Sequence, residues 1–340
     1  MTLDPAPAWL PGGQAQTVWP ALFSRSHDPA VPIVYRRERH TTPDADFIDI
    51  DWLDPAGVND GTAGEGVGLL VLFHGLEGSS RSHYALAFAD WARRNGWRYA
   101  VPHFRGCSGE LNLAPRAYHS GDHVEIGWML DQIRQSHPTG PVVAVGVSLG
   151  GNALLRWAQE SGEQAGRVVQ AVASVCSPID LTAAGHAIGR GLNRHLYTPM
   201  FLRTMKPKAL AKLAQHPGLF DAERLRQARD LYAFDNLFTA PLHGYRDTED
   251  YWHRASAKPH LADIRIPALV VNARNDPFVP AESLPAAHEV GRHVTLWQPE
   301  HGGHVGFASG PPPGDVRGLP RAVMGWMQGP LGSRWPSPAR

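Results

Sequence analysis

A serine at position 148 lies in a setting that suits nucleophilic catalysis. The segment GVSLG at residues 146–150 follows an apolar run and precedes a helical pattern. That context predicts a tight strand–turn–helix, in which small glycines at 146 and 150 avoid a clash and the serine hydroxyl projects above a sheet. The similar segment GCSGE at 106–110 lacks the second glycine at the required position. We therefore predict Ser148 as the nucleophile.

A serine hydroxyl needs a base to take its proton and a carboxylate to orient that base. Asp276 follows the apolar run 268–272, in the turn RNDP, where an Asp-Pro turn is the structural alternative. The segment HGGHVGF at 301–307 supplies two histidines behind the last predicted strand. His301 lies directly after that strand, whereas the two glycines allow His304 to turn forward. We predict Ser148, Asp276 and His304 as a catalytic triad.

Two backbone amides are expected to stabilise an oxyanion. Leu149 begins the helix after the serine, and Leu76 follows a His-Gly turn at the end of the apolar run 67–73. His74 is interpreted as structural, holding that turn by a hydrogen bond. His301 and His304 also have the spacing of metal ligands, but no third ligand is evident nearby, so we predict neither a metal nor a cofactor.

Short apolar runs alternate with helical patterns along the chain, which predicts an α/β fold with a mostly parallel central sheet flanked by helices. An antiparallel hairpin is expected at residues 33–39 and 47–52, with Asp49 and Asp51 on a solvated face. The strands are expected at residues 67–73, 99–103, 142–147, 168–175, 268–272 and 293–297.

The strand pattern stops between residues 180 and 263, where the sequence predicts helices at 199–215 and 221–235. A loop of that length is implausible in a compact domain, so we expect an inserted helical cap. The predicted organisation is a core over 1–179, a cap over 180–263, a second core part over 264–330 and a flexible tail over 331–340. An apolar stripe in the cap, including Met200, Phe201 and Met205, is expected either to line an acyl pocket or to dock the cap on the sheet.

Composition limits the classes of function. The chain has 340 residues, of which 43% are hydrophobic, and Lys+Arg and Asp+Glu both number 32. This balance gives no support to nucleic-acid binding. Two cysteines do not form a disulfide framework. The N-terminus lacks the pattern of a signal peptide, and no apolar run reaches the roughly 18 residues of a membrane span, so a cytoplasmic protein is expected.

Several longer motifs carry a resemblance to a known family. They are PGGQAQT (11–17), HGLEGSSRSHY (74–84), HFRGCSGE (103–110), AYHSGD (117–122), GVSLGGNALL (146–155), DYWHRAS (250–256) and HGGHVGF (301–307). Through these motifs the chain resembles the YheT-type hydrolases of the α/β-hydrolase superfamily and is similar to the eukaryotic abhydrolase-domain lipases. This resemblance implies the α/β-hydrolase fold and an esterase with Ser148, Asp276 and His304 as its triad. Gln14 and Asn275 depart from the family pattern, at positions where a histidine and an acidic residue are common.

These features lead to one main functional hypothesis. We expect a serine hydrolase that cleaves small-molecule carboxylic esters with short- to medium-chain, apolar acyl groups, through an acyl-enzyme. An acyltransferase, a thioesterase or amidase, or a cofactor-free lyase would use nearly the same residues. A non-catalytic interaction module is the third hypothesis, and the presence of all three triad candidates argues against it.

Overall fold

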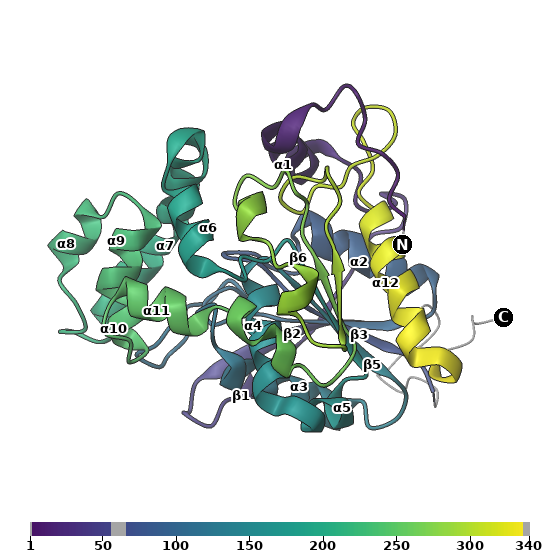
Figure 1. Cartoon of the computed structure of the whole chain (residues 1–340). Coiled ribbons are helices and arrows are strands. Elements are labelled where there is room, and N and C mark those ends of the chain that lie inside the picture. The colour runs from purple at the N-terminus through teal and green to yellow at the C-terminus, as the bar shows by residue number, and fades with distance from the viewer. Residues whose placement is uncertain (1, 56–65, 336–340) are drawn as a thin grey trace.

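The computed structural model describes residues 2–55 and 66–335, and within them eight strands form one sheet (Figure 1). The strand order is β1-β2-β4-β3-β5-β6-β7-β8. All neighbours from β4 to β8 pair in parallel, whereas β2 is antiparallel to both β1 and β4. The predicted mostly parallel sheet is confirmed. The strands are β1 (Arg36–Thr41), β2 (Phe47–Leu53), β3 (Leu69–Phe73), β4 (Arg98–Pro102), β5 (Val142–Val147), β6 (Ala171–Val175), β7 (Ala268–Val271) and β8 (Val294–Trp297).

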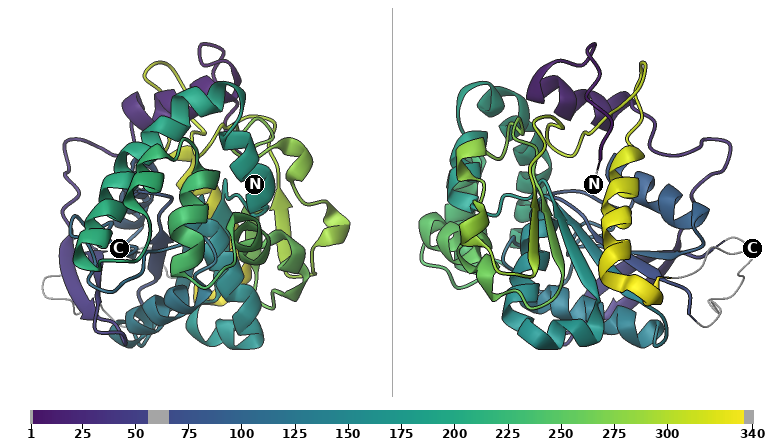
Figure 2. Two further views of the ribbon diagram at one scale, coloured as in Figure 1. Left: turned by 90° about the vertical axis from the view of Figure 1, so that its left-hand side faces the viewer. Right: turned by 45° about the vertical axis from the view of Figure 1, so that its right-hand side comes forward.

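Helices cover both faces of this sheet (Figures 1 and 2). Helices α2 (His83–Arg94) and α12 (Gly318–Leu331) pack on one face. Helices α3 (His123–Ser136), α4 (Leu149–Ser161) and α5 (Ala165–Val168) pack on the other. Because both faces are buried, the central strands are apolar at most positions on both sides rather than at alternate ones.

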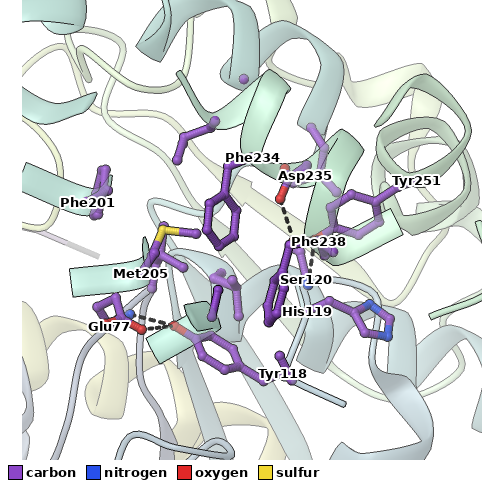
Figure 3. Close-up of a pocket in the computed structure, with 18 of the residues that line it drawn as sticks. Glu77, Tyr118, His119, Ser120, Phe201, Met205, Phe234, Asp235, Phe238 and Tyr251 are labelled. Carbon is purple, nitrogen blue, oxygen red and sulfur yellow. Dashed lines mark hydrogen bonds between the residues drawn. The ribbon is translucent and has the colours of Figure 1, made fainter. Parts of the chain in front are cut away.

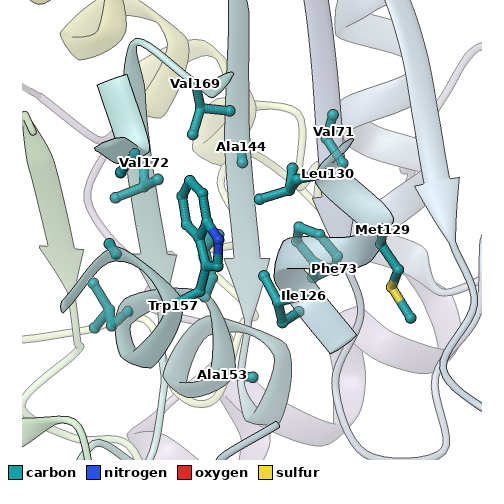
Figure 4. Packing of buried hydrophobic residues seen from close by; sticks show 14 of the residues in the cluster. Val71, Phe73, Ile126, Met129, Leu130, Ala144, Ala153, Trp157, Val169 and Val172 are labelled. Atoms are coloured by element: carbon teal, nitrogen blue, oxygen red, sulfur yellow. The ribbon is translucent and has the colours of Figure 1, made fainter. Parts of the chain in front are cut away.

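The packing on the α4 side shows how the strand residues alternate between the two layers. Val71 and Ala144 belong to the apolar cluster around the indole ring of Trp157, which also includes Ile126 and Ala153 (Figure 4). The intervening strand residues, Leu70, Leu72, Val143 and Val145, belong to the opposite cluster with α2 and α12. The sheet is therefore anchored on both sides, which fixes the positions of the loops at its carboxyl edge.

The chain between β6 and β7 is helical, with no strand in the part that the structure describes from 180 to 263. These helices share an apolar cluster of their own around Leu202, Phe234 and Phe238, and they lie beside the sheet (Figures 1 and 2). The helix expected at 221–235 is instead two short helices, each begun by an aspartate N-cap. The elements are α6 (Leu181–Ile188), α7 (Gly191–Gln215), α8 (Ala222–Gln227), α9 (Leu231–Phe234), a π-helical turn (Asp235–Thr239), α10 (Ala240–Leu242), α11 (Thr248–Ala255) and a 3-10 helix (Lys258–Asp263).

The expectation that Asp49 and Asp51 lie on a solvated strand face was wrong, because both side chains are buried. The β1–β2 register places Arg39 opposite Asp49 and Arg37 opposite Asp51. Each arginine forms a two-pronged ion pair with its aspartate, at 2.8 and 2.9 Å for Asp49 and at 2.6 and 2.9 Å for Asp51. The loop after β4 covers this face, since His103 also contacts Asp51 at 2.8 Å.

The two ends of the described chain add elements that the sequence did not clearly predict. Helix α1 (Gly12–Phe23) precedes the sheet. At the other end a 3-10 turn (Gly332–Arg334) follows Leu331, the last residue of α12. Residues 336–340 of the predicted flexible tail lie outside the described residues. No helix within the described ranges is both long and apolar enough to cross a membrane. Further 3-10 turns occupy Gly162–Gln164, Ala281–Ser283 and Ala287–Glu289.

Candidate active site

Ser148 lies on the turn between β5 and α4, as the GVSLG pattern predicted. Its φ angle is 53°, a left-handed conformation that a non-glycine residue rarely adopts. A Cβ at Gly146 would lie 2.5 Å from the Gly150 carbonyl oxygen, and one at Gly150 would lie 2.5 Å from that of His74. The two glycines are therefore required by the close approach of backbone on each side of the serine.

The structure brings the three triad candidates into one chain of contacts. His304 Nε2 lies 3.0 Å from Ser148 Oγ, and His304 Nδ1 lies 2.9 Å from Asp276 Oδ2. The other carboxylate oxygen of Asp276 accepts a hydrogen bond of 2.8 Å from the Phe278 amide. The Asp276 side chain is fully buried, while the imidazole retains 11% exposure. These distances are those of a nucleophile, a base and an orienting acid.

The Gly-rich loop after β8 determines which histidine reaches the serine. Gly302 and Gly303 have φ angles of 152° and 57°, so the backbone turns sharply between the two histidines. His301 remains exposed at the start of this turn, with its ring 3.4 Å from Asn275 Nδ2. His304 lies on the far side of the turn, and the next amide, that of Val305, lies 3.3 Å from Cys176 Sγ.

Helix α1 holds both catalytic loops, a role that the sequence did not reveal. The buried Gln16 accepts hydrogen bonds of 2.9 Å at its Oε1 from the Gly302 amide and from Asn275 Nδ2. Thr17 Oγ1 accepts a 2.9 Å hydrogen bond from the His304 amide. The motif PGGQAQT was recognised only as part of the family resemblance. Gln16 and Thr17 are adjacent, and both are buried. Their role can be recognised only from their contacts with the two loops in the folded structure.

The two amides expected to form an oxyanion hole border the same cavity as Ser148. Among the described residues, neither the Leu76 nor the Leu149 amide has a protein acceptor. Leu149 is the first residue of α4, where an amide has no partner within the helix and the helix dipole favours negative charge. Gly75 brings the other loop close, since a Cβ there would lie 3.1 Å from the Ser148 Cβ.

His74 holds the loop that carries Leu76. Its Nε2 accepts a 3.1 Å hydrogen bond from the Phe104 amide, and its Nδ1 lies 2.8 Å from the Gly75 carbonyl oxygen. The side chain is fully buried, and burial lowers the pKa of His74 to about 3. A neutral histidine with both nitrogens engaged is a structural group, in agreement with its interpretation from the sequence.

A cavity of about 140 Å³ leads from Ser148 and His304 to the helices between β6 and β7. Phe201, Met205, Phe234 and Phe238 all line it (Figure 3). Met200 lines a different, more open depression of about 230 Å³, which also reaches Ser148. Of the three predicted pocket residues, the structure places two in the cavity and one at its outer side.

A buried carboxylate at the far part of this cavity was not found from the sequence. Asp235 accepts hydrogen bonds from Thr239 Oγ1 at 2.6 Å and from Trp252 Nε1 at 2.9 Å. Burial raises the pKa of Asp235 to about 6. Nearby, Ser120 donates its amide proton to the Tyr251 hydroxyl at 2.9 Å (Figure 3). The cavity is thus apolar along most of its length and polar in this part.

The remaining candidates for chemistry do not join the site. Cys107 is buried beside Lys208, outside the cavity lining, and burial raises the pKa of its thiol to about 12. Both Cys107 and Cys176 are free thiols. In the portion of the chain described, no three or more His, Cys, Asp or Glu side chains form a group that could hold a metal ion.

Comparisons with known proteins agree with this architecture. A family model described as "alpha/beta hydrolase fold" matches residues 68–311. "Putative esterase YheT" of Escherichia coli (strain K12) is 37% identical, over 87% of this chain and 84% of its own length. "Phospholipase ABHD3" of Homo sapiens is 28% identical, over 89% of this chain and 73% of its own. The esterase PF2001 of Pyrococcus furiosus has a similar fold, with a TM-score of 0.54 at 16% identity over 89% of this chain and 92% of that chain.

Two of these matches decide the classification. The family model covers more than half of the chain, and the Escherichia coli relative is 37% identical over most of both chains. The chain belongs to the α/β-hydrolase family, and within it to the YheT-type hydrolases.

Proposed function

We propose that the chain is a serine esterase that cleaves carboxylic esters by a Ser148–His304–Asp276 triad. The observation that carries this proposal is the continuous contact from Ser148 Oγ through the imidazole to a buried carboxylate, at 3.0 and 2.9 Å. That contact opens onto a cavity beside Ser148, where the Leu76 and Leu149 amides have no protein acceptor among the described residues. The names of the related esterase and phospholipase support ester hydrolysis as the class of reaction.

The geometry supports a two-step mechanism. With a proton on Nδ1, His304 donates to Asp276, and its Nε2 accepts the proton of Ser148 as Oγ attacks the ester carbonyl carbon. The carbonyl oxygen becomes an oxyanion that the Leu76 and Leu149 amides stabilise. The imidazolium then gives its proton to the leaving alkoxide, which leaves an acyl-enzyme. In the second step His304 takes a proton from water, hydroxide attacks the acyl carbon, and Ser148 recovers its proton.

The cavity supports a small-molecule substrate with an apolar acyl chain. Phe201, Met205, Phe234 and Phe238 supply an apolar lining to the cavity that reaches Ser148, and burial of each methylene there is favourable. We propose short- to medium-chain acyl esters as substrates. The cap division of the chain, the role of Met200 and a cytoplasmic location stay predictions.

The alternative reactions use the same residues, and no contact in the site favours one of them. Acyl transfer differs only in the acceptor that attacks the acyl-enzyme, and thioester or amide hydrolysis differs only in the leaving group. A lyase would proceed without an acyl-enzyme.

A panel of p-nitrophenyl esters and the matching thioesters and anilides tests the proposal on the full chain. We expect ester turnover in the wild type and a loss of about 10⁴–10⁶ in kcat for Ser148→Ala, since removal of a triad nucleophile typically has this effect. Ser108→Ala, in the GCSGE segment, is the matched control and keeps its activity. Ser148→Ala protein with more than about a tenth of the wild-type activity would refute the assignment.

A further inference from the structure

Large apolar side chains are exposed mainly on two helices of the molecule. Among the described residues, eleven large apolar side chains are exposed, and six of them lie on α1 and α7, with exposures from 38% to 66%. The sequence led us to expect that the apolar stripe of α7 lines the pocket, but part of it faces outward. The six are Val18, Leu22, Phe23, Leu192, Leu196 and Met200.

The two helices lie side by side. Gln14 on α1 donates from Nε2 to Asn193 Oδ1 at 2.7 Å, and the Tyr197 hydroxyl on α7 donates to Gln14 Oε1 at 2.6 Å. Further along, Val18 and Leu22 line the same open depression as Met200. Three of the six exposed side chains thus line one depression, and we call the outward side of these two adjoining helices, which carries all six, the α1–α7 face.

This face surrounds an entrance to the candidate active site. The depression lined by Val18, Leu22 and Met200 also includes Ser148 and His304. Exposed apolar surface of this kind weakens solubility and is retained on soluble chains mainly where it meets a partner. A partner of the α1–α7 face must either leave the depression that reaches Ser148 open or deliver the substrate through that depression.

The charge of the same region is one-sided. Residues 181–220 hold six Lys and Arg and no Asp or Glu, and residues 5–27 also lack an acidic residue, although the whole chain is electrically balanced. Arg190, Arg194 and Arg203 are exposed and form no ion pair within the described residues. Helix α7 and its N-cap thus carry exposed apolar side chains together with arginines that form no ion pair within the described residues, a combination that suits a membrane surface with an apolar interior and anionic headgroups.

We propose that the α1–α7 face docks the protein onto an anionic lipid bilayer, so that a lipid ester passes from the membrane to Ser148 without crossing water. The evidence for this inference is the set of exposed side chains. The role that it assigns to docking rests on the proposed esterase function. A second copy of the chain fits the face less well, because a two-fold contact would bring the unpaired arginines together and cover the entrance to Ser148.

Sedimentation with vesicles tests the inference independently of catalysis. Full-length Ser148→Ala protein is mixed with vesicles of phosphatidylcholine, with or without phosphatidylglycerol, and the bound fraction is measured. We expect strong binding only when phosphatidylglycerol is present, and weaker binding as salt is raised, because salt screens the arginines. Binding to neither vesicle would overturn the inference, and it would leave the esterase proposal intact because turnover is not measured.

Variants of the α1–α7 face distinguish docking through this face from nonspecific adsorption of the protein to vesicles. In the Ser148→Ala background, Leu192→Ser with Leu196→Ser should lower vesicle affinity by about tenfold or more, since two apolar contacts with lipid are lost. Arg194→Glu with Arg203→Glu should remove the preference for phosphatidylglycerol. Val34→Ser with Val124→Ser, at exposed apolar positions outside α1 and α7, is the matched control and should bind like the parent.

Two results would contradict docking on lipid. One is unchanged vesicle binding by the Leu192→Ser, Leu196→Ser protein when its melting temperature matches the parent. The other is a dimer in light scattering that this double variant abolishes, which would make the α1–α7 face an interface between copies.

Discussion

Ser148 is held in a backbone conformation that costs on the order of 1–3 kcal/mol for a non-glycine residue. The neighbouring glycines and the pairing of β5 with β3 and β6 maintain it, so the strain is supported by the sheet. The benefit is positional, because the hydroxyl then lies 3.0 Å from His304 Nε2 while the Leu149 amide at the start of α4 has no protein acceptor among the described residues. This arrangement explains why the local pattern GVSLG was sufficient to predict the strand–turn–helix that holds Ser148.

The two histidines of the Gly-rich loop should differ strongly in their contribution to catalysis. His304→Ala removes the group that contacts both Ser148 and Asp276, so its loss in kcat should approach that of Ser148→Ala, and the double variant should lose little more. His301→Ala, the matched control, should lose about tenfold at most, through a looser loop. Steady-state kinetics on p-nitrophenyl butyrate measures this, and an inactive His301→Ala protein with an active His304→Ala protein would reverse the assignment.

The residues that sequence could not supply are those that act through tertiary contacts. Asp276 and His304 follow predicted strands, so their order and position in the chain indicated their place at the sheet edge. Gln16 contacts Gly302 across 286 positions of sequence, and no local pattern encodes that pairing. Asp235 likewise lies in a helical segment, where its sequence neighbours do not distinguish it from other polar residues. Its place in the cavity lining is visible only in the structure.

Helix α1 acts at the scale of an element, as a brace between the turn of Asp276 and the loop of His304. Gly13 allows this contact, since a Cβ there would lie 1.8 Å from the Asn275 carbonyl oxygen. Gly306 meets the same helix, with a Cβ position 1.7 Å from the Gln16 carbonyl oxygen. Both loops are thus packed directly against backbone, and small shifts of α1 would move the base and the acid together.

Loss of the Gln16 side chain should therefore affect the rate of chemistry more than binding. Gln16→Ala removes the acceptor shared by Gly302 and Asn275, and we expect kcat to fall by about tenfold or more with little change in KM. Gln14→Ala, two residues away on α1 and in contact with α7 instead, is the control. Equal losses in both variants, or a raised KM with unchanged kcat, would show that α1 does not position the triad.

The β1–β2 hairpin shows where element-scale prediction fails. Alternation along β2 correctly indicated a strand, and an acidic alternate face normally lies in water. Here the cross-strand arginines of β1 and the loop after β4 cover that face, and the aspartates become buried ion pairs. Burial of the acidic face depends on what packs over it, which the strand's own sequence does not contain.

At the scale of the whole molecule, the substrate cavity forms between the sheet edge and the helices that follow β6. Ser148, the proposed nucleophile, directly follows strand β5, while Phe201, Met205 and Phe238 come from the intervening helices. Neither part encloses the cavity alone. The chain-length preference of the enzyme is therefore a property of how the two parts meet.

Turnover should rise as the acyl chain of the substrate lengthens from acetyl to medium length. Each methylene buried in the apolar lining is worth about 0.8 kcal/mol, which corresponds to about a fourfold gain in kcat/KM per methylene until the cavity is full. Met205→Ala should reduce this gain without changing acetate turnover. A flat or falling series from p-nitrophenyl acetate to octanoate would contradict an apolar acyl pocket.

The central claim is that Ser148 is the residue that attacks the substrate. A fluorophosphonate probe reacts with an activated serine, and digestion of the labelled full chain followed by mass spectrometry identifies the modified residue. The account predicts one adduct, on Ser148, that is absent from Ser148→Ala protein and forms much more slowly in His304→Ala protein. An adduct on another serine, such as Ser108, or labelling that persists in Ser148→Ala protein, would contradict it.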